Sequence, residues 1–231
     1  MASTEEKNKT TVLSLGGSLI VPDRINRAFL SGFRALILNH IKKGKKFIII
    51  CGGGSTCRNY QHAAADVAKL TRDDLDWLGI HSSRLNAHLL RTIFRSNAYP
   101  RIVKDPRKKV KTNKPVIIAA GWKPGFSTDY DAVMLARAHS VKTVLNLTDV
   151  DYVYTKDPKK TGAKPIREIS WKNFRSMVGN RWHPGLHSPF DPVAAKKAEQ
   201  FGQRVIIMKG TNLKNLNSLL LQKQFKGTVI Y

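Results

Sequence analysis

The stretch KFIIICGGGST, residues 46–56, decides the fold class of this chain. Residues 47–50 are apolar at every position and rich in β-branched side chains, which is typical of a strand buried on both faces of a parallel sheet. The three glycines that follow end the strand and permit a tight turn into a helix. A strand, a glycine loop and a helix start form the repeating unit of an open α/β sheet.

The same unit occurs at residues 11–15 before Gly16 and at residues 115–119 before Gly121. Between these runs, apolar residues recur at helical spacing, as in Phe29, Phe33 and Leu36. We therefore predict a three-layer α/β/α sandwich with a mostly parallel central sheet, in which ligands bind beyond the carboxyl ends of the strands. Further strands are expected at residues 142–147, 152–154, 204–208 and 227–230.

Length alone allows one large domain or two small ones, and the absence of an internal repeat or a long Pro/Ser/Gly linker in the sequence favours one. The chain has 231 residues, 42% of them hydrophobic, which excludes a disordered chain and a small disulfide scaffold. We expect a flexible segment at 1–10 and a single domain at 11–231. The two cysteines form no disulfide framework, and no apolar run approaches the length of a membrane helix, so a cytoplasmic protein without membrane contact is expected.

The net charge of +24, from 40 Lys and Arg against 16 Asp and Glu, indicates an anionic partner. Nucleic acid, a membrane surface and a small nucleotide all carry the required phosphates, so charge alone does not choose among them. The most basic stretch, residues 101–114, is interpreted as a solvated surface segment.

Two glycine loops, Gly16-Gly17-Ser18 and residues 52–56, each follow a strand and begin a helical segment. Backbone N–H groups in such loops can approach phosphate oxygens closely, and the helix start adds partial positive charge. Two loops therefore indicate two phosphate groups, although tight turning alone would also explain the glycines. Neither the GxxxxGK[ST] nor the GxGxxG motif is present.

Two polar clusters follow, at residues 121–129 and 146–157. In the first, Ser127, Thr128 or Asp129 could bind a ligand or simply cap the next helix. The second ends in Asp-Pro and could be a polar turn. Trp122 could pack around a base or in the core.

The order of these features resembles the amino-acid-kinase superfamily and, within it, the uridylate kinases of the archaeal type. The likeness extends from about residue 12 to residue 230. It rests on six ordered motifs, LGGS at 15–18, GGG at 52–54 with Arg58, DWLGI at 76–80, PGFSTD at 124–129, VDYVYTKDP at 150–158 and FDP at 190–192.

This resemblance implies ATP-dependent phosphorylation of UMP to UDP in pyrimidine biosynthesis, with Mg²⁺ accompanying ATP. It implies an acceptor half at about 11–140, an ATP-binding half at about 141–231, and a homohexamer built from dimers. The helix region around Leu85, Leu89 and Ile93 would form core or a dimer contact. Small nucleotides then become the expected partners, and nucleic acid an unexpected one.

The resemblance also implies roles for matching positions. UMP would contact Gly53, Gly54, Arg58, Asp76, Ser127 and Thr128. ATP would contact Gly16, Gly17, Ser18, Asn146, Thr148, Tyr154 and Asp157. The residue expected to organise the catalytic basic groups is Asp191. The sequence assigns no metal ligand.

Three positions depart from the family pattern. Relatives often have lysine where this chain has Ser14 and Ser55, and glycine where it has Tyr152. Lys209, which follows a predicted strand, and Arg58 are the candidate replacement cations. These departures leave two alternatives open: the same fold with another acceptor, such as isopentenyl phosphate, carbamate or another nucleoside monophosphate, and a non-catalytic protein that binds nucleotides or nucleic acid.

Overall fold

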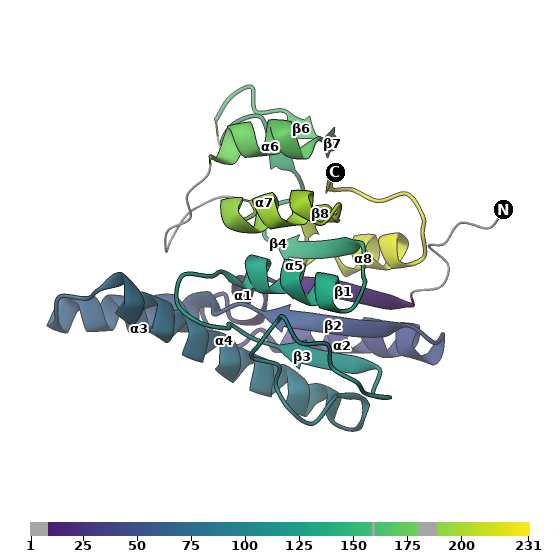
Figure 1. The fold of residues 1–231 in the computed structure, drawn as a ribbon, viewed down its shortest axis with the longest axis horizontal. Helices are drawn as coiled ribbons and strands as arrows, with labels where there is room; N and C mark the ends of the chain where they lie inside the picture. The colour runs from purple at the N-terminus through teal and green to yellow at the C-terminus, as the bar shows by residue number, and fades with distance from the viewer. Residues whose placement is uncertain (1–8, 159, 180–188) are drawn as a thin grey trace.

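The computed structural model describes residues 9–158, 160–179 and 189–231 and shows a seven-stranded sheet between two layers of helices (Figure 1). Most of the expected flexible segment at 1–10 lies outside the described residues. The predicted three-layer α/β/α sandwich is confirmed. The strands of the main sheet are β1 (Thr10–Leu15), β2 (Lys46–Cys51), β3 (Val116–Ala119), β4 (Thr143–Thr148), β7 (Glu168–Ile169), β8 (Arg204–Lys209) and β9 (Thr228–Ile230).

The strand order is β3-β2-β1-β4-β8-β9-β7, so β1 lies near the middle of the sheet. Its neighbours β2 and β4 run parallel to it, with Leu15 opposite Cys51 and Leu147. In the main sheet, the pair of β8 and β9 is antiparallel and the other strand pairs are parallel. The sheet is therefore mostly parallel, as predicted. A separate antiparallel pair joins β5 (Val153–Tyr154) to β6 (Pro165–Ile166).

Adjacent residues of each central strand point into different cores, which explains why both faces are apolar. In β1, Val12 belongs to one cluster of buried residues and Leu13 to the other, and both side chains are fully buried. Ile48 and Ile49 of β2 divide in the same way. A strand covered on both faces needs no polar side chains, so its sequence shows a continuous apolar run.

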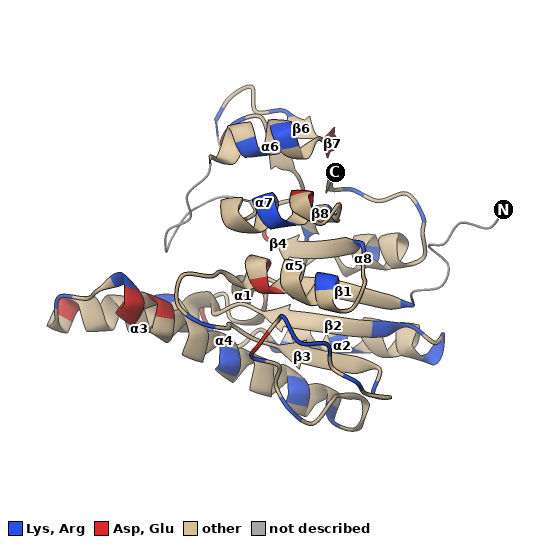
Figure 2. Cartoon of the chain, viewed as in Figure 1, with Lys and Arg blue, Asp and Glu red and all other residues tan. Residues whose placement is uncertain are grey.

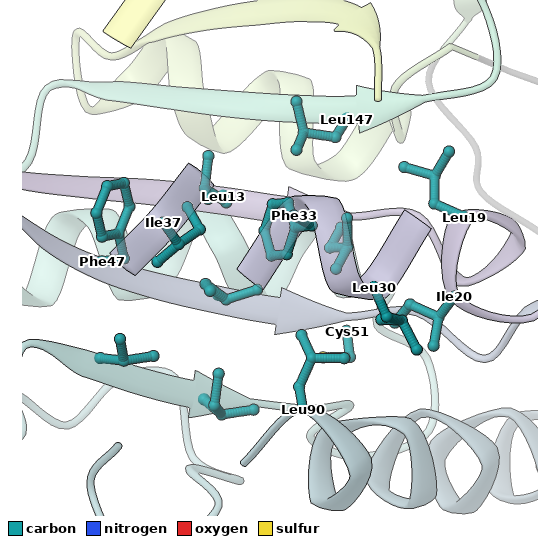
Figure 3. Packing of buried hydrophobic residues seen from close by; sticks show 14 of the residues in the cluster. Leu13, Leu19, Ile20, Leu30, Phe33, Ile37, Phe47, Cys51, Leu90 and Leu147 are labelled. Carbon is teal, nitrogen blue, oxygen red and sulfur yellow. The ribbon is translucent and has the colours of Figure 1, made fainter. Parts of the chain in front are cut away.

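Helices from different parts of the chain cover the two faces. Figure 3 shows part of one cluster, with Phe33 and Ile37 of α2 beside Leu13 and Phe47. The helices that contribute to this cluster are α1 (Gly17–Ile20), α2 (Arg27–Lys42), α4 (Arg72–Phe94) and α8 (Leu213–Leu220). Those of the opposite cluster are α5 (Thr128–Ala138), α6 (Trp171–Val178) and α7 (Pro192–Gln200).

The remaining helix, α3 (Gly54–Val67), packs on α4, and the two project together beyond the sheet (Figure 1). Ser55 is the one residue of α3 that is buried. None of the helices in the described part of the chain is both long and apolar enough to cross a membrane.

Candidate active site

The two glycine loops lie against each other at the carboxyl ends of β1 and β2. Because these strands are neighbours in register, Gly52 N–H can donate to the carbonyl of Leu15 at 3.0 Å. A Cβ placed on Gly17 would lie only 2.0 Å from the backbone nitrogen of Gly54, and Gly54 itself has φ +69. The contact therefore requires glycine on both sides, and it brings the two predicted phosphate-binding loops together.

Arg58 joins the two loops by a side chain. It lies near the start of α3, and its Nη1 is 3.5 Å from the Oγ of Ser18 in the first loop. Both side chains are exposed, so this guanidinium is accessible to an anion between the loops. Of the two replacement cations considered from sequence, Arg58 is the one that belongs to the helix following the second loop and contacts a residue of the first.

The segment 121–127, in the predicted acceptor half, is fixed to α4. Asp76 accepts a hydrogen bond from Gly125 N–H at 2.7 Å. Arg84 donates from Nη2 to the carbonyl of Trp122 at 2.9 Å, and the Trp122 N–H donates to buried Asp131 at 3.1 Å. The predicted ribose-binding carboxylate thus lies next to the predicted phosphate- and base-binding segment.

The Trp122 ring is partly buried and packs against the edge of one core cluster. The guanidinium of Arg107 lies 4.6 Å and the ammonium of Lys123 4.5 Å from its centroid, and Phe126 packs against it at 5.1 Å between centroids. Asp105 holds the Arg107 guanidinium with two contacts of 2.9 Å. Residues 101–114, which we interpreted as solvated surface, therefore also brace the predicted acceptor segment through Arg107.

Ser127 is the residue that caps α5, because its Oγ accepts from Tyr130 N–H at 3.2 Å. The same hydroxyl donates to Asp191, the N-cap residue of α7. Of the alternatives left open by the sequence, capping is thus satisfied by Ser127, while Asp129 makes other contacts.

Asp129 and Asp191 form a pair of carboxylates beside Ser14. Ser14 Oγ donates to Asp129 Oδ1 at 3.0 Å, and the Asp191 N–H donates to Asp129 Oδ2 at 3.2 Å. The partners of these carboxylates are hydroxyls and peptide N–H groups. Burial, followed by the charge of Asp191, raises the pKa of Asp129 to about 7, and burial also raises the pKa of Asp191.

Ser55, at the other expected lysine position, is part of the scaffold. It is buried, its Oγ donates to the carbonyl of Asp23 at 3.2 Å, and its N–H donates to the carbonyl of Val21 at 2.9 Å. Both serines are therefore committed to hydrogen bonds within the protein, and each occupies a position where the resemblance leads us to expect an ammonium group.

A cavity of about 590 Å³ lies in the half predicted to bind ATP, where β8 ends and α8 begins. Lys209 is the last residue of β8 and is paired with Thr148 of β4. The residues lining the cavity are Asp151, Lys209, Thr211, Asn212, Leu213 and Lys214. Two ammonium groups and one carboxylate in such a cavity can bind a polyphosphate with its accompanying cation.

The other predicted ATP residues lie at or near the end of β4. Asn146 is buried and donates from Nδ2 to the carbonyl of Pro189 at 3.0 Å, whereas the hydroxyl of Thr148 donates to Asp149 at 3.1 Å. Tyr154 belongs to the hairpin of β5 and β6, where Tyr152 packs edge-on to it with 6.3 Å between centroids. Asp157 follows this hairpin strand, and its carbonyl accepts from Lys160 N–H at 2.9 Å.

Sequence reasoning missed Asn86 and Lys214. Asn86 is buried within α4, and its Nδ2 donates to the carbonyls of Gly52 at 2.8 Å and Gly53 at 3.1 Å, which fixes the triple-glycine loop. A polar residue on the apolar side of a helix was the available signal for Asn86. For Lys214, the sequence offered no signal beyond its position about one turn after a predicted strand and a glycine.

The model of the amino acid kinase family matches residues 9–209. The uridylate kinase of Methanospirillum hungatei is 32% identical over 226 residues, which are 96% of this chain and 94% of that protein. The uridylate kinase of Methanoregula boonei is 30% identical and covers 96% of this chain and 95% of its own. A solved structure, uridylate kinase from Archaeoglobus fulgidus, has a TM-score of 0.80 at 27% identity and covers 96% of this chain and 99% of its own.

Together, the fold, the paired glycine loops and these relatives show that the chain has the scaffold of a nucleotide kinase. The chain belongs to the amino acid kinase family and, within that family, groups with the uridylate kinases. The resemblance stated from the sequence motifs is confirmed.

Proposed function

We propose that this chain transfers the γ-phosphoryl group of ATP to UMP and releases UDP and ADP. The observation that carries the proposal is the backbone contact between the loops of Gly17 and Gly54, with Arg58 reaching from one loop to the other. Phosphoryl transfer mainly requires two phosphates to be aligned and their charge neutralised. Two adjoining phosphate-binding loops provide that alignment.

The chemistry proceeds in line and without a protein nucleophile. An oxygen of the UMP phosphate attacks the γ-phosphorus while the bond from that phosphorus to the β–γ bridging oxygen breaks. UMP would lie on Gly53, Gly54 and Arg58, with its ribose near Asp76 and its phosphate and base covered by the segment containing Ser127 and Thr128. We assign the donor phosphates to Gly16, Gly17 and Ser18 and the rest of ATP to Asn146, Thr148, Tyr154 and Asp157.

Charge neutralisation in the transition state is assigned to Arg58 and Lys209. Asp191, through Ser127 and Asp129, positions the segment that closes the acceptor site. When bound with ATP, Mg²⁺ would neutralise phosphate oxygens. Asp151, which lines the same cavity as Lys209, would offer the ion a carboxylate oxygen. Over the described ranges 9–158, 160–179 and 189–231, no three His, Cys, Asp or Glu side chains are grouped as metal ligands, so phosphates and water would complete the coordination.

A coupled assay of ADP release, with ATP, Mg²⁺ and a panel of acceptors, tests this function. The panel is UMP, CMP, AMP, isopentenyl phosphate and carbamate, and we expect UMP to give the highest kcat/KM. A different preferred acceptor would favour the first alternative. If no acceptor raises ADP release above background while calorimetry shows ATP binding, the chain is a non-catalytic nucleotide-binding protein.

For assembly, we propose a homohexamer built from dimers through α3 and α4. These projecting helices carry exposed large apolar residues, among them Val67 at 88%, Tyr60 at 63% and Leu85 at 63%. Light scattering coupled to size exclusion should give a mass near six chains, and Leu85→Glu should lower it. A monomeric wild-type protein would contradict the proposal.

We propose that the protein is cytoplasmic, because its proposed substrates are nucleotides and its cysteines, Cys51 and Cys57, are both free thiols. Small nucleotides, rather than nucleic acid or membrane, are its proposed partners.

A further inference from the structure

A second basic cavity lies at the opposite edge of the sheet from the glycine loops, where β1, β2, β4 and β8 begin. Its volume is about 680 Å³, and its floor includes Leu145, Ile206 and Leu220. We call it the basic groove. Of the 15 described residues that line it, five are basic and none is acidic, the basic ones being Lys9, Lys43, Lys45, Lys142 and Arg204. Figure 2 shows blue at the start of β2 and in the turn before it.

The basic groove brings like charges together at a cost to the folded state. Burial lowers the pKa of Lys45, and the charge of Lys43 lowers it further. The neighbouring His40 is buried, and the same two lysines add to the lowering of its pKa that burial causes. Positive charges that lower one another's pKa values repel each other. An anion that binds among them offsets this repulsion and so stabilises the folded protein.

Helix capping accounts for only one of these lysines. The Lys45 ammonium donates to the carbonyl of Leu220 at the end of α8. Lys9 and Lys142, by contrast, come immediately before the strand segments of β1 and β4, and both are exposed, as is Lys43. Three exposed lysines from separate chain segments thus line the same cavity as leucine and isoleucine side chains.

We propose that the basic groove is a second ligand site, which binds a polyphosphate chain, either free or carried by a nucleotide. Its volume falls within the range of about 300–1,000 Å³ that is usual for small-molecule sites. Lysines bind phosphates as point charges, and the apolar floor offers a surface to an attached organic group. The length of β1 separates it from the glycine loops by about 20 Å, so the groove can be occupied independently of them.

Calorimetric titration with inorganic tripolyphosphate near physiological salt tests the proposal without Mg²⁺ or acceptor. The groove variant is Lys43→Ala with Lys142→Ala. Its matched control, Lys104→Ala with Lys111→Ala, removes the same charge from the segment 101–114. We expect binding about tenfold weaker in the groove variant and changed by less than about twofold in the control, because salt screens distant charges. Circular dichroism melts confirm that each variant is folded.

Unchanged affinity in the groove variant would overturn the proposal, because tripolyphosphate would then be bound elsewhere. An equal loss in both variants would also overturn it, since a diffuse positive field would be the cause. A second arm with ATP distinguishes the sources of the chain. Two ATP sites in the wild type and one in the groove variant would identify a nucleotide as the ligand. One ATP site in both, with weakened tripolyphosphate binding, would identify the free chain. A third arm uses single-stranded RNA, and loss of RNA binding alone would replace the proposal with a nucleic-acid surface.

Discussion

Asp129 should make the protein less stable as pH rises, and the substitution Asp129→Asn should remove this dependence. The carboxyl has an ordinary pKa of 3.8 and a pKa of about 7 in the folded chain, because burial and the charge of Asp191 disfavour ionisation. A raised folded pKa means that the folded state retains a proton that the unfolded state releases. The resulting stability is complete below the ordinary pKa and is lost as pH rises through the folded pKa.

The size of the effect follows from the interval between the two values. Between pH 5 and pH 8 the unfolded carboxyl is ionised throughout, while the folded one ionises only near the top of the range. About two pH units of linkage at about 1.4 kcal/mol per unit give a loss of about 2–3 kcal/mol from this group. Asparagine resembles the protonated carboxyl, since its amide can donate to Ser14 Oγ while its oxygen accepts from the Asp191 N–H.

Urea unfolding of both proteins at pH 5 and pH 8 measures the difference. The free energy of unfolding should fall by about 2–3 kcal/mol more in the wild type than in Asp129→Asn. Asp73→Asn makes the same change of charge at an exposed site of α4 and should follow the wild type. Parallel pH profiles for the wild type and Asp129→Asn would refute the reasoning, since Asp129 would then be ionised in the fold throughout this range.

Three further substitutions test the site. Gly17→Ala places a Cβ 2.0 Å from the Gly54 nitrogen, so it should lower the free energy of unfolding by about 3 kcal/mol and abolish ADP release; an unchanged urea midpoint would contradict the loop contact. Lys209→Ala should lower kcat about a hundredfold with little change in the KM for UMP, and an unchanged kcat would remove it as the replacement cation. Arg107→Ala should raise the KM for UMP about fivefold through loss of its contact with Trp122, whereas Lys108→Ala serves as the control; steady-state kinetics showing equal effects would refute this bracing role.

The sequence predicts the layers and the ligand-binding edge because both depend on local patterns. An apolar run such as residues 47–50 followed by glycine indicates both a buried strand and the place where it ends. Once the strands are parallel, their glycine loops must lie at one edge. The contact of Gly17 with Gly54 then follows from the pairing of β1 and β2. The short strands β6 and β7, of two residues each, have no periodic pattern and are set by their neighbours in space.

The polar contacts of the site could not be predicted, because they join residues far apart in sequence. Ser14 and Asp129 are separated by 115 positions, and Asn86 recognises carbonyls more than 30 residues away. The motif comparison located Ser14 and Ser55 as missing lysines but gave no account of what the serines do. The division into an acceptor half and an ATP-binding half near residue 140 stays a prediction.

The acidic and the basic side chains of the candidate site lie in different places. At the carboxyl edge of the sheet, the partly buried Asp129 and the buried Asp191 have neutral partners, and the cations near the predicted phosphates are Arg58, Lys209 and Lys214. With serine instead of lysine at position 14, Asp129 has no ammonium group there to neutralise. Its carboxyl can lie beside a neutral hydroxyl because, with a pKa of about 7, it is largely protonated below neutral pH. The missing ammonium should therefore affect turnover more than folding, since the transition-state charge would have to be met by Arg58 and Lys209, the proposed replacement cations.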